Sequence, residues 1–112
     1  MHPEDKLNPM FVCDINALNP DQRRRHGVLA KILRSAVVQF VELPNGYAAK
    51  FGSNLDQEIS EFCNLELLCC PFFSLELAQD ECNSVLTITG HGEIKPFIRT
   101  EFGIPAIEAT DA

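Results

Sequence analysis

The chain has no tryptophan, one tyrosine and two methionines among its 112 residues, and its apolar positions never form a long continuous run. A membrane-spanning helix needs about 18 or more consecutive apolar residues, so none is expected. The first five residues, Met1 to Asp5, also lack the basic and apolar regions of a secretory signal. Both absences predict a cytoplasmic protein that does not enter a membrane.

Basic residues are also scarce, with nine lysines and arginines against sixteen acidic residues and a net charge of -7. Such a chain repels phosphate backbones unless its basic side chains gather on one face. The only dense basic run, Arg23 to Arg25, spreads around a helix and is therefore expected to face solvent. We expect no nucleic-acid partner.

The sequence contains no CxxC pair, phosphate-binding loop, dinucleotide fingerprint or Ser-His-Asp spacing. This argues against the common zinc motifs and the common nucleophilic enzymes. Five cysteines are an odd number, and without an export signal they predict reduced thiols and no disulfide framework.

What is present suits one small domain, since 46% of the residues are hydrophobic. We expect an irregular arm over residues 1–18, a folded core over 19–103 and a frayed tail over 104–112. The core begins with a clear helix signal, in which Asn19 caps the helix, Pro20 takes the first position and Gln22 completes a capping box. This first helix is predicted to end near Arg34.

Two β-hairpins are predicted from alternating, β-rich runs. Residues 37–43 and 47–51 are separated by Pro44-Asn45-Gly46, and Asn-Gly favours a tight turn with positive φ angles. Residues 73–77 and 85–89 form the second pair, with residues 80–83 as the turn.

A second helix is expected to start from a cap at Ser53 or Asn54 and to end near Cys69, because Pro71 forbids its continuation. A short third helix is expected over residues 94–103. The resulting order, α-ββ-α-ββ-α, predicts an α+β two-layer sandwich with a four-stranded antiparallel sheet and helices on one face.

The second helix contains one anomaly. A turn of about 100° per residue places Ile59 and Phe62 on one buried stripe, with Glu66 in its middle and Cys69 and Cys70 on either side. A carboxylate there is costly unless it is paired, hydrogen-bonded or protonated. The partners considered are Arg34, Lys50, His91 and Lys95.

Three interpretations of this corner stay open. Glu66, Cys69 and Cys70, with Cys63 or Cys13, suit a soft metal such as zinc or another small ligand, because thiolates bind such ions well. Alternatively the cysteines only fill the corner of a structural or protein-interaction module. A thiol redox enzyme is least favoured, because a helix carboxyl end and a nearby carboxylate oppose thiolate formation. An enzymatic role is neither required nor favoured.

Leu65 and Leu68 fall off the buried stripe, and the outer sheet face is a second surface without a partner. Either surface predicts a homodimer. His91, between two glycines, is a weak further site residue.

The segment Glu66-Leu67-Leu68-Cys69-Cys70-Pro71-Phe72, followed by Leu86-Thr87-Ile88-Thr89-Gly90 and by Lys95 with Phe97, resembles a group of small bacterial proteins with no known activity. Their pattern is an ExxCCPF corner and a closing LTG segment with a K-x-F. The likeness covers roughly residues 20 to 103. The likeness implies that Glu66, Cys69, Cys70 and Lys95 form one constellation of residues, that is, a single site. It implies no reaction or ligand for that site. His91-Gly92-Glu93 departs from the pattern, which leaves that loop without an implied role.

Overall fold

A computed structural model describes residues 14–105. The first helix, α1, spans Pro20–Ala36, two residues beyond the predicted end. Its capping box is confirmed, since the Gln22 backbone N–H donates to Asn19 Oδ1 at 2.8 Å and the Asn19 N–H donates to Gln22 Oε1 at 2.9 Å. Leu29 and Leu33 on α1 are buried, and they define the face that meets the rest of the chain.

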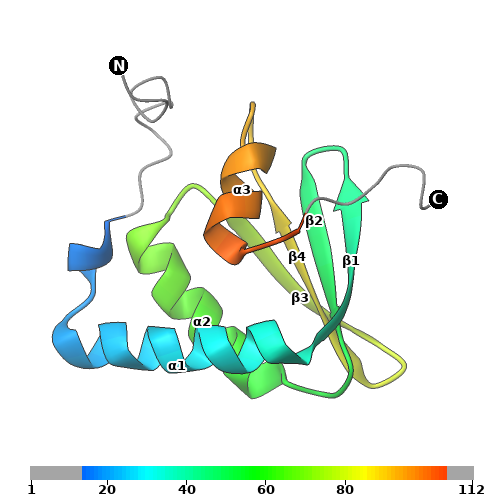
Figure 1. The fold of residues 1–112 in the computed structure, drawn as a ribbon, viewed down its shortest axis with the longest axis horizontal. Helices are drawn as coiled ribbons and strands as arrows, with labels where there is room; N and C mark the ends of the chain where they lie inside the picture. The colour runs from blue at the N-terminus through cyan, green and yellow to red at the C-terminus, as the bar shows by residue number, and fades with distance from the viewer. Residues whose placement is uncertain (1–13, 106–112) are drawn as a thin grey trace.

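Four strands form one antiparallel sheet in the order β1-β2-β4-β3 (Figure 1). Their bounds are β1 Val37–Leu43, β2 Gly46–Phe51, β3 Ser74–Asp80 and β4 Asn83–Thr89. Helix α2 covers Asp56–Cys69 and α3 covers Lys95–Phe102. The predicted α+β order is therefore confirmed.

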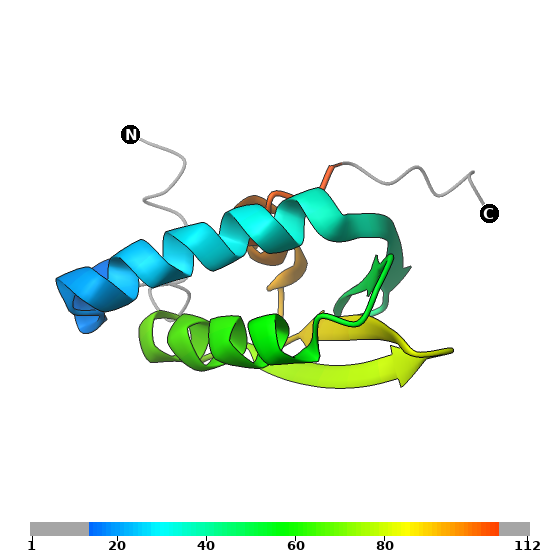
Figure 2. The same ribbon diagram turned by 90° about the horizontal axis from the view of Figure 1, so that it is seen from below.

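The helices meet one face of this sheet. Seen from below, α1 runs above α2, and α3 lies on the same side as α1 (Figure 2). The row Phe40, Ala49, Leu86 and Leu77 crosses the sheet on the face that turns toward the helices. The core lies between this row and the buried sides of the helices. No helix within residues 14–105 has the length and apolar character needed to cross a bilayer.

Several boundaries differ from the prediction. The second helix has no side-chain cap of its own, because its first backbone amides are bound from elsewhere. The Leu55 N–H donates to the Ser84 hydroxyl at 2.8 Å, and the Asp56 N–H donates to Asn54 Oδ1 at 3.0 Å. Ser84 of β4 thus binds one of these amides and Asn54, one of the two expected caps, binds the other, although the N-cap position itself is Leu55.

The two ends of the core extend further than expected. A 3-10 helix, η3, spans Ile15–Ala17, and the following Leu18 is 1% exposed. The Asp14 N–H donates to the Cys69 carbonyl at 2.8 Å, which ties this segment to the end of α2. Ile104, placed in the frayed tail, is buried as well. Residues 1–13 of the expected arm lie outside the described residues.

The arginine run makes contacts within the chain. Arg25 forms a two-pronged ion pair with Glu61 of α2, at 2.7 and 2.9 Å, and Arg24 pairs with Asp21. Arg23 Nη1 donates to the Leu18 carbonyl at 3.0 Å. The Arg25–Glu61 pair therefore joins α1 to α2. The next residue along α1 is His26.

The first hairpin turn was predicted for the wrong reason. Neither Asn45 nor Gly46 has a positive φ angle, so the expected Asn-Gly geometry is absent. Gly46 is required by a close approach instead, because a Cβ there would lie 1.9 Å from the carbonyl oxygen of Ile88. The positive φ angles occur in the second hairpin, at Glu81 (53°) and Cys82 (74°).

Glu81 and Cys82 both have positive φ angles, which are unfavourable for residues that carry a side chain. Replacing Glu81→Asn together with Cys82→Gly supplies the residues that a tight hairpin of this kind favours, so the free energy of unfolding should rise by about 1 kcal/mol. Urea denaturation measures it. Asn45→Gly is the matched control, and it should lower stability slightly because that turn needs no positive φ. An equal gain from both changes would contradict this account.

Candidate functional site

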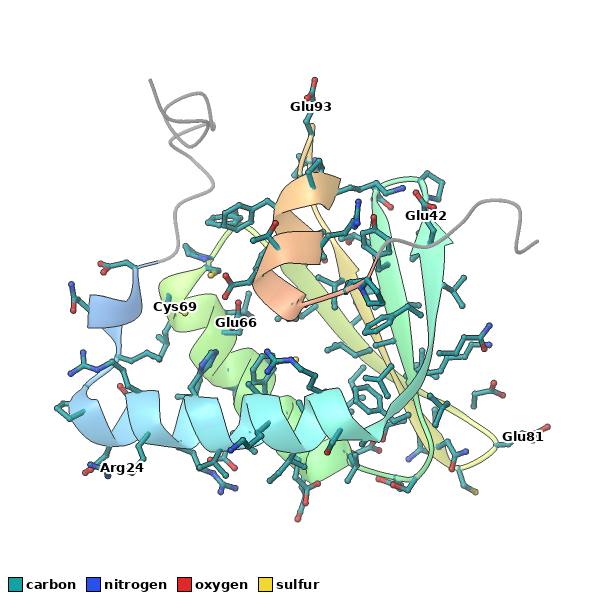
Figure 3. The ribbon with its side chains drawn as sticks, viewed as in Figure 1. Arg24, Glu42, Glu66, Cys69, Glu81 and Glu93 are labelled. Atoms are coloured by element: carbon teal, nitrogen blue, oxygen red, sulfur yellow. The ribbon has the colours of Figure 1, made fainter. Side chains whose placement is uncertain are left out.

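Glu66 lies where the three helices meet. It comes from α2 and is 1% exposed, so its carboxylate is removed from water. His26 of α1 reaches it, with Nε2 at 2.7 Å from Glu66 Oε1. The ring of Phe62 stacks on the imidazole of His26 at 5.0 Å and an angle of 23°, which holds that ring in place. Figure 3 shows Glu66 and Cys69 close together on α2.

Glu101 brings the third helix, α3, to the same point. Its pKa is raised to about 7 by burial, by a hydrogen bond with Glu66 and by the negative charge of Glu66, while His26 opposes the rise. Two carboxylates form a hydrogen bond only when one of them holds a proton. No other donor within the described residues reaches Glu66 Oε2. Glu66 Oε1 is therefore bound by His26, whereas Oε2 has no hydrogen-bond partner among the described residues.

None of the four predicted cations is the partner of Glu66. Lys95 Nζ pairs with Glu42 at 2.5 Å and lies 5.3 Å from the centre of the Tyr47 ring, so the constellation implied by the resemblance does not include it. His91 is exposed in the loop after β4. The true partner, His26, lies three and seven residues before Leu29 and Leu33 on the buried side of α1. That spacing was the signal available in the sequence.

Cys69 is a free thiol, 2% exposed, at the last position of α2. Its Sγ lies 3.4 Å from the Glu66 carbonyl oxygen and 3.8 Å from that of Leu65. Burial, together with the negative charges of Glu66 and Glu101, raises the pKa of this thiol to about 11. The pKa of Cys63 is likewise raised to about 11, by burial and by Glu66. For Cys69 the effect of Glu66 agrees with the prediction, but burial is the larger cause.

Cys70 differs from the prediction. It is disulfide-bonded in this structure, so it offers no thiolate to a ligand. Its Sγ lies 3.9 Å from Cys69 Sγ and 3.8 Å from Glu101 Oε2. The expectation of reduced thiols therefore does not hold for Cys70, although Cys63, Cys69 and Cys82 are free. Cys13 lies outside the described residues.

Two groups of metal-ligating atoms surround Glu66. The donor atoms of His26, Glu66 and Cys69 all lie within 4.8 Å of one another, and so do those of Glu66, Cys70 and Glu101. Because Cys70 is not a thiolate, the first group is the one with nitrogen, oxygen and sulfur donors available. Of the predicted ligands, Glu66 and Cys69 come together, whereas Cys63 is in neither group.

A cavity of about 110 Å³ adjoins this cluster. Its polar wall consists of His26, Glu66 and Glu101, with Arg34 further along α1. The rest of its wall is apolar and comes from the sheet and from the helices, including Phe40, Phe51, Leu86, Ala30, Phe62 and Phe102. Sequence reasoning found Glu66 but not this cavity, since the wall combines residues from six different elements.

Comparisons with protein-family models, with curated proteins and with solved structures gave no match to this chain.

The raised pKa of Glu101 predicts how stability depends on pH. The folded state holds this proton more tightly than the unfolded chain does, so the Glu101 contribution to stability is complete below about pH 4.5 and is lost as the pH rises through about 7. Glu101→Gln donates an N–H to Glu66 at every pH. Between about pH 5 and pH 8 the variant should lose less stability than the parent, by on the order of 1 kcal/mol after solvent screening.

Chemical denaturation at both pH values measures this difference. Glu93→Gln is the matched control, because Glu93 is exposed at the far end of the molecule (Figure 3). If Glu101→Gln and Glu93→Gln show the same pH dependence, then Glu101 does not share a proton with Glu66.

Proposed function

We propose that this protein binds a soft or borderline divalent cation of the zinc class through His26, Glu66 and Cys69. The observation that carries the proposal is the convergence of an imidazole nitrogen, a carboxylate oxygen and a thiol sulfur within 4.8 Å, on two helices. These are the donor types that zinc takes in proteins.

The distances suit such an ion. Bonds of about 2.0 to 2.3 Å in a tetrahedral arrangement place neighbouring donors roughly 3.3 to 3.8 Å apart, so the cluster needs only small side-chain movements. His26 and Glu66, now hydrogen-bonded at 2.7 Å, would separate slightly to admit the ion. Glu101 is adjacent to Glu66 and supplies a further carboxylate oxygen.

Charge also supports a cation. Glu66 is buried, Glu101 is beside it, and His26 is the one basic side chain that contacts Glu66 within the described residues. A bound divalent ion would neutralise these carboxylates and would favour the thiolate of Cys69, because a coordinating thiol loses its proton. Binding therefore has to release protons, and affinity has to increase with pH.

Metal titration tests the proposal. Metal-free protein should bind Zn²⁺ in calorimetry, and Co²⁺ should produce visible bands together with a sulfur-to-metal charge-transfer band. Cys69→Ser should remove the charge-transfer band, and His26→Ala should weaken Zn²⁺ binding tenfold or more. Cys63→Ser and His91→Ala are matched controls that should bind as the parent does.

Circular dichroism of each variant shows whether it folds. Calorimetry of the parent in two buffers of different protonation enthalpy counts the released protons and needs no variant. Absence of Zn²⁺ binding at about pH 8, where release of protons is easier, would overturn the proposal. So would unchanged binding by a folded Cys69→Ser.

The alternative is that the protein is a structural module. This alternative is supported by a different property of the same cluster: His26, Glu66 and Glu101 link all three helices. In that case Cys69→Ala would lower stability without affecting any ligand. A thiol enzyme is not proposed, because the pKa of about 11 leaves Cys69 protonated at neutral pH.

We also propose that two chains associate. The apolar surface available for this contact is smaller than the sequence predicted. Leu65 is 8% exposed and packs inside, so it is not available, whereas Leu68 is 51% exposed. The outer sheet face is mixed in character, since one of its rows consists of Val41, Ala48, Thr87 and Glu76.

Sedimentation at micromolar concentration should give the mass of two chains for the parent and of one chain for Leu68→Lys, because a charge at the centre of an apolar contact opposes association. A parent mass of 12.5 kDa, that of one chain, would contradict the dimer.

A further inference from the structure

The cavity beside Glu66 has an apolar body and a charged end. Its apolar wall includes Phe40 and Phe51 of the sheet and Ala30 of α1, while Glu66, Glu101 and His26 close one end. Cys69 is not part of this wall. The cavity and the proposed metal site thus share His26 and Glu66, but not Cys69.

The charged end contains an acceptor without a donor. Glu66 is 1% exposed and lines the cavity, and its Oε2 has no hydrogen-bond partner among the described residues. A buried acceptor without a donor is unfavourable, and more so when it is charged. A ligand that donates to Oε2 would recover this energy.

We propose that the cavity binds a small primary amine in its protonated form, with the ammonium group between Glu66 and Glu101 and the apolar part of the molecule inside the cavity. The ammonium would donate to Glu66 Oε2, which has no hydrogen-bond partner among the described residues. It has three N–H donors, which suits two carboxylates that carry no donor of their own. The rings of Phe62 and Phe102 also line the cavity, and aromatic faces attract cations.

Size and charge restrict the ligand further. A dry apolar cavity of about 150 Å³ holds benzene, so a cavity of about 110 Å³ suits an apolar part of roughly four to six non-hydrogen atoms, with the ammonium group beyond it between the carboxylates. An anionic ligand is disfavoured because two carboxylates lie at the inner end. Arg34 also lines the cavity, but it is exposed and forms no ion pair with Glu66 or Glu101 within the described residues, so solvent weakens its attraction for an anion.

The amine and the metal would share Glu66, but the amine also needs Glu101 and the cavity, whereas the metal needs Cys69 and His26, so the two proposals can fail separately. The test uses the full chain after treatment with a chelator, with benzylamine as the probe. Amide chemical shifts near Ala30 and Phe102 should move in a saturable way. Benzyl alcohol, which has the same shape without the charge, should bind at least tenfold more weakly, and benzoate should not bind.

Variants separate the two parts of the site. Ala30→Leu fills the cavity while leaving both carboxylates in place, and Glu101→Gln removes one charge; each should weaken benzylamine binding at least tenfold. Cys82→Ser and Glu93→Gln, both at exposed positions, should bind benzylamine as the parent does.

Three results would overturn the amine proposal, whatever the outcome for zinc. They are the absence of saturable shifts for the folded parent, equal binding of benzylamine and benzyl alcohol, and unchanged binding by Ala30→Leu. Circular dichroism confirms folding of each variant, and the comparison among the three probes on the parent needs no variant.

Discussion

The buried carboxylate of Glu66 is the constraint on which the arrangement of the three helices depends. A charge that is 1% exposed has to be compensated inside the protein, and the compensation comes from His26 of α1 and Glu101 of α3. Phe62 packs on His26, and Arg25 beside it pairs with Glu61. Removal of Glu66 from this junction would leave the polar groups of two other helices without their partner.

Burying ionisable side chains where three helices meet has a large desolvation cost. A buried ionic cluster is often no more stabilising than apolar side chains of the same volume, and a leucine at position 66 would continue the stripe formed by Ile59 and Phe62. The presence of an acid, with one oxygen that lacks an independent donor, is better explained by a ligand. Both proposals follow from this feature, since a metal ion and an ammonium group are two cations that an acid pair of this kind attracts.

Sequence reasoning reached the fold because its signals are local. The capping box at Asn19, the alternation within the strands and the glycine after α3 each act over a few residues, and the structure contains all three. The anomaly at Glu66 was also visible as a break in a periodic pattern. Its partners were not, because His26 and Glu101 lie 40 and 35 residues away and only packing brings them together. Leu65 was misplaced because the buried side of α2 is wider than a single stripe: it meets α1, β3 and η3.

The central claim, that Glu66 organises a cation site, is tested most directly by anomalous scattering from crystals grown with Zn²⁺ and measured on either side of the zinc absorption edge. One strong peak is expected, about 2.0 to 2.3 Å from each of His26 Nε2, a Glu66 carboxylate oxygen and Cys69 Sγ. Zinc peaks confined to exposed side chains such as His91, with the hydrogen bond between His26 and Glu66 intact, would contradict it.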